Sequence, residues 1–335
     1  MTKAVLLINL GTPDSPTPSK VRKYLTQFLN DRRVIDIHPV GRFILVNLII
    51  VPFRSFRSSK LYQHIWTPEG SPLLLNSLAL KEKLQKKMGP DYSVELGMRY
   101  QSPSIKGALE RIRQARPESI YVLPLYPQYA SSSTGSTLEE VFRIVKKWEV
   151  IPNMNVMSKF YDHPKFVEVL VAEARKYKME DYDHVVFSYH GLPERQIMKA
   201  SAHYGGNTCT MGSCCESITQ NNRYCYRANC FETTRRLVSA LAIPKEKYTT
   251  SFQSRLDSKW LMPFSDKVIA ELGKKGAKKI LVFSPAFVAD CLETLYEIGH
   301  EYEEIFKQHG GEKITLVNSL NSNEEWVNAL VEMLN

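Results

Sequence analysis

The stretch VVFSYHGLPER, residues 185–195, carries the pattern that decides the fold. An apolar run leads into a polar end, and Gly191 and Pro193 then turn the chain. Short apolar runs that stop at Gly or Pro are typical of strands buried in a parallel sheet. His190 therefore stands at the carboxyl end of a buried strand, which is where open parallel sheets bind their ligands.

The same pattern occurs once more, as LLINLGTPDSP at residues 6–16. Two further landmarks also recur in the same order along the chain. MRYQSPS (98–104) is answered by SFQSRLDS (251–258), and IYVLPLYPQYASSSTG (120–135) by ILVFSPAFVADCLETL (280–295). Paired landmarks in a fixed order predict two similar halves.

Between the apolar runs lie stretches whose apolar residues recur every three or four positions, as in amphipathic helices. Alternating strands and helices predict the α/β class, with a doubly wound parallel sheet in each half and the site in a cleft between the halves. We expect the halves to cover residues 1–150 and 151–335. Strands are expected at 4–10, 94–99, 120–125, 184–189, 248–252 and 279–284, and helices at 78–87, 105–115, 138–145, 166–176, 233–241, 265–273 and 291–306.

Composition narrows the class of protein. The chain has 335 residues, of which 43% are apolar and 24% charged, as in soluble globular proteins. Its net charge of +9 favours anionic partners, but the positive residues are scattered and form no groove-reading motif, so we expect no nucleic-acid binding. The longest apolar run, residues 43–53, is about half of the roughly 20 residues that span a bilayer. We therefore expect no membrane span and a cytoplasmic location.

His190 is the first candidate for chemistry, because an imidazole at a strand end suits a base or a metal ligand. A histidine that only binds its own loop is the alternative. Glu293 strengthens the chemical interpretation, since it follows a strand that matches the His190 strand in the paired landmarks. An imidazole and a carboxylate on opposite faces of a ligand can remove protons and hold a metal ion in turn.

An acidic row accompanies Glu293. Asp290, Glu293, Glu297 and Glu301 are offset by three, seven and eleven positions, which places them along one side of a helix. A solvated helix face is the ordinary explanation of such a row. With a metal site at its inner end, we expect the row to deliver hydrated divalent cations through oxygen ligands.

Two weaker signals lie in the N-terminal half. SSSTGST, residues 131–137, could hold a phosphate or carboxylate at a helix N-terminus, although a helix cap explains its hydroxyls equally well. Arg54, Arg57 and Lys60 follow the apolar run and could form a lip that contacts a membrane or an amphiphile. An ordinary amphipathic helix is the alternative for this basic set.

Five of the six cysteines fall within 22 residues, in the pattern C-x4-C-C-x9-C-x4-C. Four thiolates can hold zinc or an iron–sulfur cluster. Zinc sites usually contain C-x2-C pairs, which are absent from this stretch, so the spacing favours a [2Fe–2S] cluster with zinc as the lesser alternative. A redox pair, or no metal at all, also stays open. The candidate ligands are four of Cys209, Cys214, Cys215, Cys225 and Cys230.

From these motifs the chain resembles ferrochelatase, the enzyme that inserts ferrous iron into protoporphyrin IX in the last step of haem synthesis. The resemblance runs nearly end to end. It rests on LLINLGTP (6–13), FLNDRRVID (28–36), GSPL (70–73), GMRYQSP (97–103), YPQYASSSTGST (126–137), FSYHGLP (187–193), SFQSR (251–255), WLMP (260–263) and ADCLETLYEI (289–298).

The resemblance implies two Rossmann-like halves with the porphyrin between them, Fe²⁺ and protoporphyrin IX as substrates, and lyase activity. It places the histidine of the family on His190 and its metal-side glutamate on Glu293. It also implies a set of porphyrin-binding residues, in which aromatic rings cover the macrocycle and Arg and Ser groups bind its propionates. These are Asn9, Arg54, Arg99, Tyr100, Tyr126, Tyr129, Ser133, Gln253, Trp260 and Phe287.

Two departures refine the resemblance. Family members that use coproporphyrin carry a Tyr after Gly-Thr-Pro, whereas Asp14 stands here, which favours the protoporphyrin form. The cysteines form an insertion at residues 203–231, as in a subgroup of bacterial ferrochelatases with an internal cluster. Peripheral contact with the inner face of the membrane stays open, as does the oligomeric state. The rival interpretation is an iron–sulfur sensor that binds a tetrapyrrole without turnover, and it would need neither His190 nor Glu293.

Overall fold

The computed structural model describes residues 3–334, which fold into two compact units. Unit 1 contains residues 3–126, 130–159 and 321–334, and unit 2 contains residues 127–129 and 160–320. These bounds differ from the expected 1–150 and 151–335, because the last helix packs on a helix of the first unit and Lys83 forms an ion pair of 3.2 Å with Glu324.

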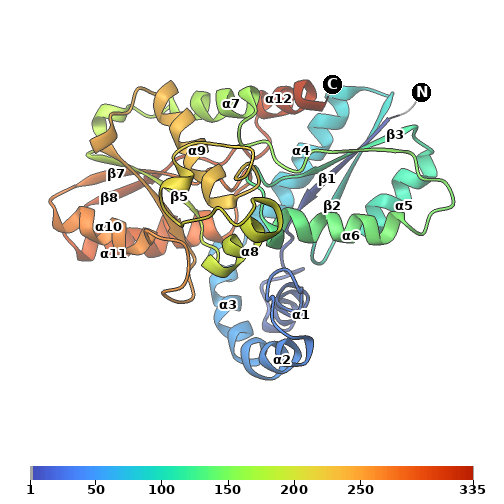
Figure 1. The fold of residues 1–335 in the computed structure, drawn as a ribbon, viewed down its shortest axis with the longest axis horizontal. Coiled ribbons are helices and arrows are strands. Elements are labelled where there is room, and N and C mark those ends of the chain that lie inside the picture. The colour runs from blue at the N-terminus through green and yellow to red at the C-terminus, as the bar shows by residue number, and fades with distance from the viewer. Residues whose placement is uncertain (1–2, 335) are drawn as a thin grey trace. The chain divides into compact units, whose positions relative to one another are not determined.

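Each unit contains one four-stranded parallel sheet with helices on its two faces (Figure 1). The strand order is β2-β1-β3-β4 in unit 1 and β6-β5-β7-β8 in unit 2, so the two sheets have the same topology. This confirms the α/β class and the two similar halves. The strands are β1 (Lys3–Asn9), β2 (Tyr92–Met98), β3 (Ser119–Pro124), β4 (Asn153–Val156), β5 (His184–His190), β6 (Tyr248–Gln253), β7 (Lys279–Phe283) and β8 (Lys313–Leu316).

The helices of unit 1 cover its sheet and add a separate helical group. Residues Leu6 and Ile8 of β1 pack with Leu109 and Val141, so α5 and α6 share one face of the sheet. Helices α1, α2 and α3 gather together away from the sheet strands (Figure 1). The helical segments are α1 (Pro18–Leu29), α2 (Pro39–Ile44), η1 (Leu45–Ile50), α3 (Val51–Ile65), α4 (Pro72–Met88), α5 (Ile105–Ala115), η2 (Ser131–Gly135), α6 (Ser136–Val145) and α12 (Glu324–Leu334).

Unit 2 repeats this arrangement. Val186 of β5 packs with Ile269, Ile298 and Phe306, so α10, η6 and α11 share one face of the sheet. Helices α7 and α9 lie on the other face (Figure 1). The segments are α7 (Pro164–Ala174), η3 (Met179–Asp181), α8 (Glu194–Tyr204), η4 (Ser213–Cys215), α9 (Tyr226–Ala240), η5 (Lys245–Lys247), α10 (Ser265–Lys274), η6 (Glu293–Tyr302) and α11 (Glu303–Gln308).

One glycine in each unit turns the chain after its first strand. A Cβ on Gly11 would lie 2.0 Å from the carbonyl oxygen of Tyr100, and a Cβ on Gly191 would lie 2.7 Å from that of Gln253. Only glycine allows the backbone to come so close to the neighbouring strand end. The two Gly-x-Pro motifs therefore perform the same structural task in both units.

The helix observed at residues 293–308 differs from the α-helix that the sequence predicts over 291–306. Residues Glu293–Tyr302 form a π-helix, and α-helical geometry resumes only in α11. Each turn of a π-helix holds more residues than an α-turn, and π-segments are frequent at functional sites. Residues four or five apart, such as Glu293 and Glu297, therefore lie about one turn apart on this segment.

The structure also corrects the expectation that no segment is long enough to cross a membrane. Helices α2, η1 and α3 run on continuously as a helix of 27 residues, Pro39–Ile65, which is long and apolar enough to cross a membrane by length and composition alone. The length of this helix could not be predicted from the apolar run, because Asn47 and several basic residues interrupt it. Its apolar window is only 17% buried.

Candidate active site

His190 is the last residue of β5, and its ring is fixed by its own loop. Its Nδ1 lies 2.6 Å from the carbonyl oxygen of Gly191. A carbonyl only accepts hydrogen bonds, so Nδ1 carries the proton, and the lone pair of the neutral ring lies on Nε2. Phe287 lies beside the ring, with 6.2 Å between the ring centroids. The geometry presents Nε2 as a base or as a metal ligand.

The loop after His190 is held by its neighbours in unit 2. The amide of Gly191 donates to the carbonyl of Gln253 at 2.8 Å. The ring of Trp260 packs against Gly191, because a Cβ there would lie 3.4 Å from it, and Trp260 also forms a β-bridge with Pro193. The structure thus brings Trp260, one of the expected porphyrin-binding residues, next to the His190 loop.

Gln253 links the His190 strand to the segment that carries Glu293. Its side chain is only 1% exposed. Its Oε1 accepts a hydrogen bond of 2.8 Å from the hydroxyl of Ser188. Its Nε2 donates to the main-chain carbonyl of Glu293 at 3.0 Å and to Glu297 at 3.1 Å. Sequence analysis placed Gln253 against the porphyrin, whereas its amide is engaged inside unit 2.

Glu297 is surrounded by hydrogen-bond donors. Its Oε1 accepts from the amide of Ser254 and from the hydroxyl of Tyr302, both at 2.7 Å, and Oε2 accepts from the Ser254 hydroxyl. Burial and the Glu297 charge raise the pKa of Tyr302, so this hydroxyl stays protonated and can donate. Ser254 has a φ of +62°, an unusual conformation for a residue with a side chain, and Glu297 holds it in place.

Glu293 begins the π-helix and is half-buried, as is Asp290. The Cys291 thiol lies beside the Glu293 carboxylate, and burial together with this charge raises the pKa of the thiol. Glu301, at the outer end of the acidic row, is exposed. The row thus runs from half-buried to exposed positions. Its middle member, Glu297, already accepts hydrogen bonds from neighbouring side chains.

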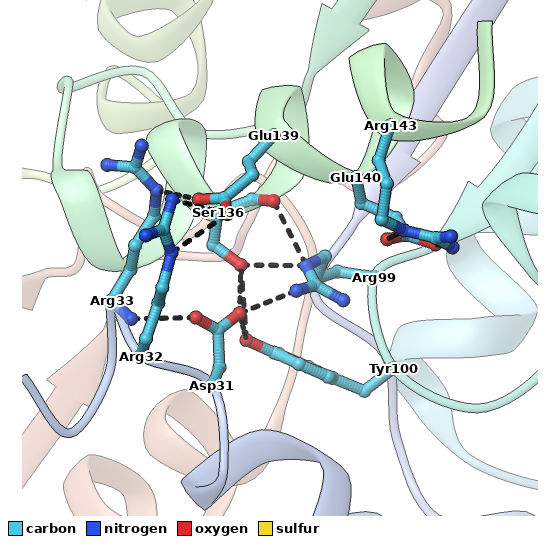
Figure 2. A network of polar contacts seen from close by, with 9 residues as sticks. All are labelled: Asp31, Arg32, Arg33, Arg99, Tyr100, Ser136, Glu139, Glu140 and Arg143. Atoms are coloured by element: carbon cyan, nitrogen blue, oxygen red, sulfur yellow. Dashed lines mark hydrogen bonds and ion pairs between the residues drawn. The ribbon is translucent and has the colours of Figure 1, made fainter. Parts of the chain in front are cut away.

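A second polar network lies in unit 1 and contains Arg99 and Tyr100 (Figure 2). The carboxylate of Asp31 accepts from Arg99 at 2.6 Å, from the hydroxyl of Tyr100 at 2.9 Å and from Ser136. Burial alone would raise the pKa of Asp31, but the bonds from Ser136 and the Arg33 amide, with the Arg99 charge, lower it overall. The Arg99 guanidinium is thus already paired with a buried acid.

The other expected porphyrin-binding residues differ in exposure. Asn9 is buried, and its amide donates to Ser77 at 3.2 Å. Arg54 lies on the exposed face of α3, apart from the Asp31 network. The remaining residues are half-buried, and these are Tyr126, Tyr129 and Ser133.

The cysteines of the insertion are gathered in unit 2. The sulfur atoms of Cys214 and Cys215 lie 4.0 Å apart. Cys209 interacts with Cys214, and Cys215 with Cys225 and Cys230. The thiol of Cys215, together with backbone amides of α9, lowers the pKa of Cys225 against the effect of burial. Within residues 3–334, however, no group of three or more His, Cys, Asp or Glu side chains is arranged to hold a metal ion.

Comparison with known proteins decides the family. The ferrochelatase family model matches residues 2–335. The chain belongs to the ferrochelatase family. Its activity is therefore iron insertion into a porphyrin in haem synthesis, and the enzyme is a lyase. This confirms the resemblance that the motifs indicated.

Curated relatives cover nearly the whole chain. Ferrochelatase from Coxiella burnetii (strain Dugway 5J108-111) is 45% identical over 331 residues, which is 98% of this chain and 92% of that protein. Ferrochelatase from Legionella pneumophila (strain Lens) is 42% identical over 336 residues, covering 100% of this chain and 99% of that protein. The family assignment thus rests on full-length similarity.

Solved structures confirm the fold alone. SirB from Bacillus subtilis with Fe³⁺ has a TM-score of 0.52 at 12% identity, covering 100% of this chain and 94% of that one. The sirohydrochlorin chelatase SirB from Bacillus subtilis subspecies spizizenii, in complex with cobalt, has a TM-score of 0.54 at 13% identity, covering 99% and 93%. The chelatase-like fold of this ferrochelatase is therefore shown.

Sequence reasoning did not find several residues of the two networks. Ser254 and Tyr302 lie within or near quoted motifs, but nothing in the spacing shows that they bind Glu297. Asp31 stands inside FLNDRRVID, and an acid followed by two arginines was the available signal.

Proposed function

We propose that this ferrochelatase inserts Fe²⁺ into protoporphyrin IX, with His190 as the proton acceptor and Glu293 on the metal side. The observation that carries the proposal is the hydrogen bond between Nδ1 of His190 and the carbonyl of Gly191. That bond leaves the Nε2 lone pair as the reactive position of the ring. The amide of Gln253 supports the assignment, because it binds the Glu293 backbone from the strand beside His190.

The reaction exchanges protons for metal without a change in oxidation state. Two pyrrole N–H bonds break, the iron binds all four ring nitrogens in place of its water ligands, and the iron stays ferrous. Nε2 of His190 takes one proton at a time and passes it on to water, since a protonated imidazole cannot accept another. Glu293 supplies a carboxylate that holds the hydrated cation by oxygen ligands while its water is lost. Porphyrin contact by Trp260 and Phe287 would place the macrocycle beside Nε2.

Protoporphyrin is proposed as the substrate because of the residue after Gly-Thr-Pro. Asp14 pairs with Lys20 at 3.8 Å and Lys23 at 3.6 Å, so this position is occupied by an acid tied to α1. Steady-state assays with protoporphyrin IX and coproporphyrin III at matched iron concentrations test the choice. We expect a higher kcat/KM for protoporphyrin. A higher value for coproporphyrin would contradict this part of the proposal.

The acidic row is our proposed route for iron delivery. Glu301 is exposed and would meet the hydrated ion first, and Asp290 and Glu293 would receive it at the inner end. Both oxygens of Glu297 already accept hydrogen bonds. To bind a passing ion, Glu297 would therefore have to give up a hydrogen bond from Ser254 or Gln253. The main contribution of Glu297 is to hold those two residues in place.

We also propose that four of the five gathered cysteines hold a [2Fe–2S] cluster, with zinc as the lesser alternative. The donor type and number match such a cluster, and the lowered pKa of Cys225 favours the thiolate that such metals bind, although the described thiols are not arranged around a metal ion. A cluster would supply a redox-sensitive centre in this segment. Anaerobic purification followed by iron, sulfide and zinc analysis tests the assignment. Zinc without sulfide would replace the cluster by the alternative.

The proposed location is the cytoplasm, with peripheral contact at the inner face of the membrane. The helix Pro39–Ile65 exposes Phe43, Leu48 and Phe53, and Arg54 and nearby cations border these side chains. Its opposite face packs in unit 1, where Asn47 exchanges hydrogen bonds with Asn30, the residue that follows α1. A helix with one face packed on protein and one apolar, cation-bordered face suits the surface of a bilayer rather than its interior.

A further inference from the structure

Tyr226 connects the cysteine insertion to the backbone of His190. It is the first residue of α9 and directly follows Cys225, which caps that helix. Its side chain is buried, and its hydroxyl donates a hydrogen bond of 2.8 Å to the main-chain carbonyl of His190. The bond joins two segments that are 36 positions apart in the chain. A residue of the insertion thus holds the peptide group that carries the His190 ring.

The same face of α9 carries one of the cysteines. Cys230 lies four residues after Tyr226, and residues four apart on a helix are neighbours. Cys230 is fully buried, and its thiol interacts with the Tyr226 hydroxyl. One hydroxyl therefore contacts a cysteine of the cluster region on one side and the His190 carbonyl on the other.

A second hydroxyl contact fixes α9 against β5. The hydroxyl of Tyr189 lies 2.9 Å from that of Thr234, and both residues are buried. The insertion is also tied to α9, because Arg235 donates to the carbonyl of Cys215 at 2.9 Å. A shift of α9 at its first turn would therefore move the end of β5 as well.

We propose that Tyr226 is a positioning residue for His190, through which the cysteine segment (residues 203–231) controls the placement of the catalytic ring. This inference rests on the proposed role of His190. The Tyr226 hydroxyl holds the His190 carbonyl and the Gly191 carbonyl holds Nδ1 of the ring, so the two contacts together fix the position of Nε2. Misplacement by about 1 Å lowers turnover strongly, since proton transfer needs the reacting atoms in contact.

The test compares two tyrosine variants of the full chain. Y226F removes the hydroxyl at His190, and Y204F removes a half-exposed hydroxyl of the same segment that binds only Arg223 among the contacts described for it. We expect Y226F to lower kcat about tenfold while KM for protoporphyrin and for Fe²⁺ changes less than about twofold. Y204F should keep the wild-type kcat. An unchanged kcat in Y226F, or an equal fall in both variants, would overturn the proposal.

Hydrogen–deuterium exchange gives a readout that does not depend on turnover. In Y226F the peptide that covers residues 187–192 should exchange faster, because the loop held by Tyr226 opens more often. Faster exchange with an unchanged kcat would show that the bond is structural only. If the wild type lacks turnover, the proposed function fails, while exchange still reports on the bond between Tyr226 and His190.

A double-mutant cycle tests the link to the cysteines. C225S removes the thiol that interacts with Cys215 at the start of α9, so it should lower kcat in the wild-type background. In the Y226F background the same change should have little further effect, because the connection to His190 is already lost. Independent, multiplicative effects of the two substitutions would contradict control through Tyr226.

Discussion

The side-chain amide of Gln253 donates a hydrogen bond of 3.0 Å to the main-chain carbonyl of Glu293. The main-chain carbonyl of Gln253 accepts from Gly191, the residue after His190. One buried glutamine therefore touches the backbone at both proposed catalytic residues. The contacts that hold the backbone of both proposed residues therefore lie within unit 2.

Replacement of Gln253 by Met should disturb this link. The variant keeps the size of the side chain but removes the donor to the Glu293 carbonyl, and it leaves the Ser188 hydroxyl with Ser265 as its remaining side-chain partner. We expect a loss of about 1–3 kcal/mol in unfolding free energy and a fall in kcat of about tenfold. Gln85→Met is the matched control, because Gln85 makes its three hydrogen bonds to backbone in unit 1. Equal effects of both variants on kcat would contradict the positioning role.

Glu297 and Glu301 should respond differently to neutralisation. Glu297→Gln replaces an acceptor of four hydrogen bonds, so it should lower stability and kcat through Ser254 and Gln253. Glu301→Gln should instead raise the KM for Fe²⁺ severalfold at an unchanged kcat, because it removes an exposed charge from the proposed delivery route. Initial rates against Fe²⁺ concentration separate the two patterns. An unchanged KM in both variants would exclude the acidic row from delivery.

Asp31 should make the free energy of unfolding depend on pH in the acid range. Its pKa in the folded protein lies below the ordinary value of 3.8, so the ionised carboxylate stabilises the fold at neutral pH. This stabilisation is lost as the pH falls below about 4, through the lowered pKa. Asp31→Asn should cost about 2–4 kcal/mol at pH 7, since it leaves Arg99 unpaired. Urea unfolding from pH 7 to pH 3 should show this difference shrinking below pH 4, whereas a constant difference would contradict the assignment.

The exposed face of helix Pro39–Ile65 should bind lipid surfaces. Replacement of both Leu48 and Phe53 by Ser removes two side chains that are 62% and 77% exposed. We expect this variant to lose sedimentation with vesicles of phosphatidylglycerol and phosphatidylcholine, because apolar insertion supplies most of the binding free energy. Val150→Ser is the control, as Val150 is 80% exposed but lies outside the helix. Unchanged sedimentation of the double variant would contradict membrane contact.

Much of the fold could be predicted from local patterns. The six expected strands lie within one residue of observed strand ends or inside them, because buried parallel strands show as short apolar runs closed by Gly or Pro. The paired landmarks correspond to two sheets of the same topology. The edge strands β4 and β8 have four residues each and were not predicted, since so short a run carries little pattern.

The networks around the site could not be predicted in this way. The bond between Tyr226 and His190, like those of Ser254 and Tyr302 with Glu297, joins residues that tertiary packing brings together. The π-helix at Glu293 also leaves no trace in an α-helical periodicity. His190 and Glu293 could be proposed from the sequence only because each stands at the end of a recognisable strand or beside a repeated motif.

The most direct test of the account is an anaerobic assay of iron insertion. Purified protein is mixed with protoporphyrin IX and Fe²⁺, and the loss of porphyrin fluorescence is followed in the wild type and in His190→Ala. The account predicts catalytic loss in the wild type and at least a hundredfold slower loss in the variant, about the effect of removing a general base. Tight porphyrin binding without turnover in the wild type, or equal turnover in His190→Ala, would contradict it.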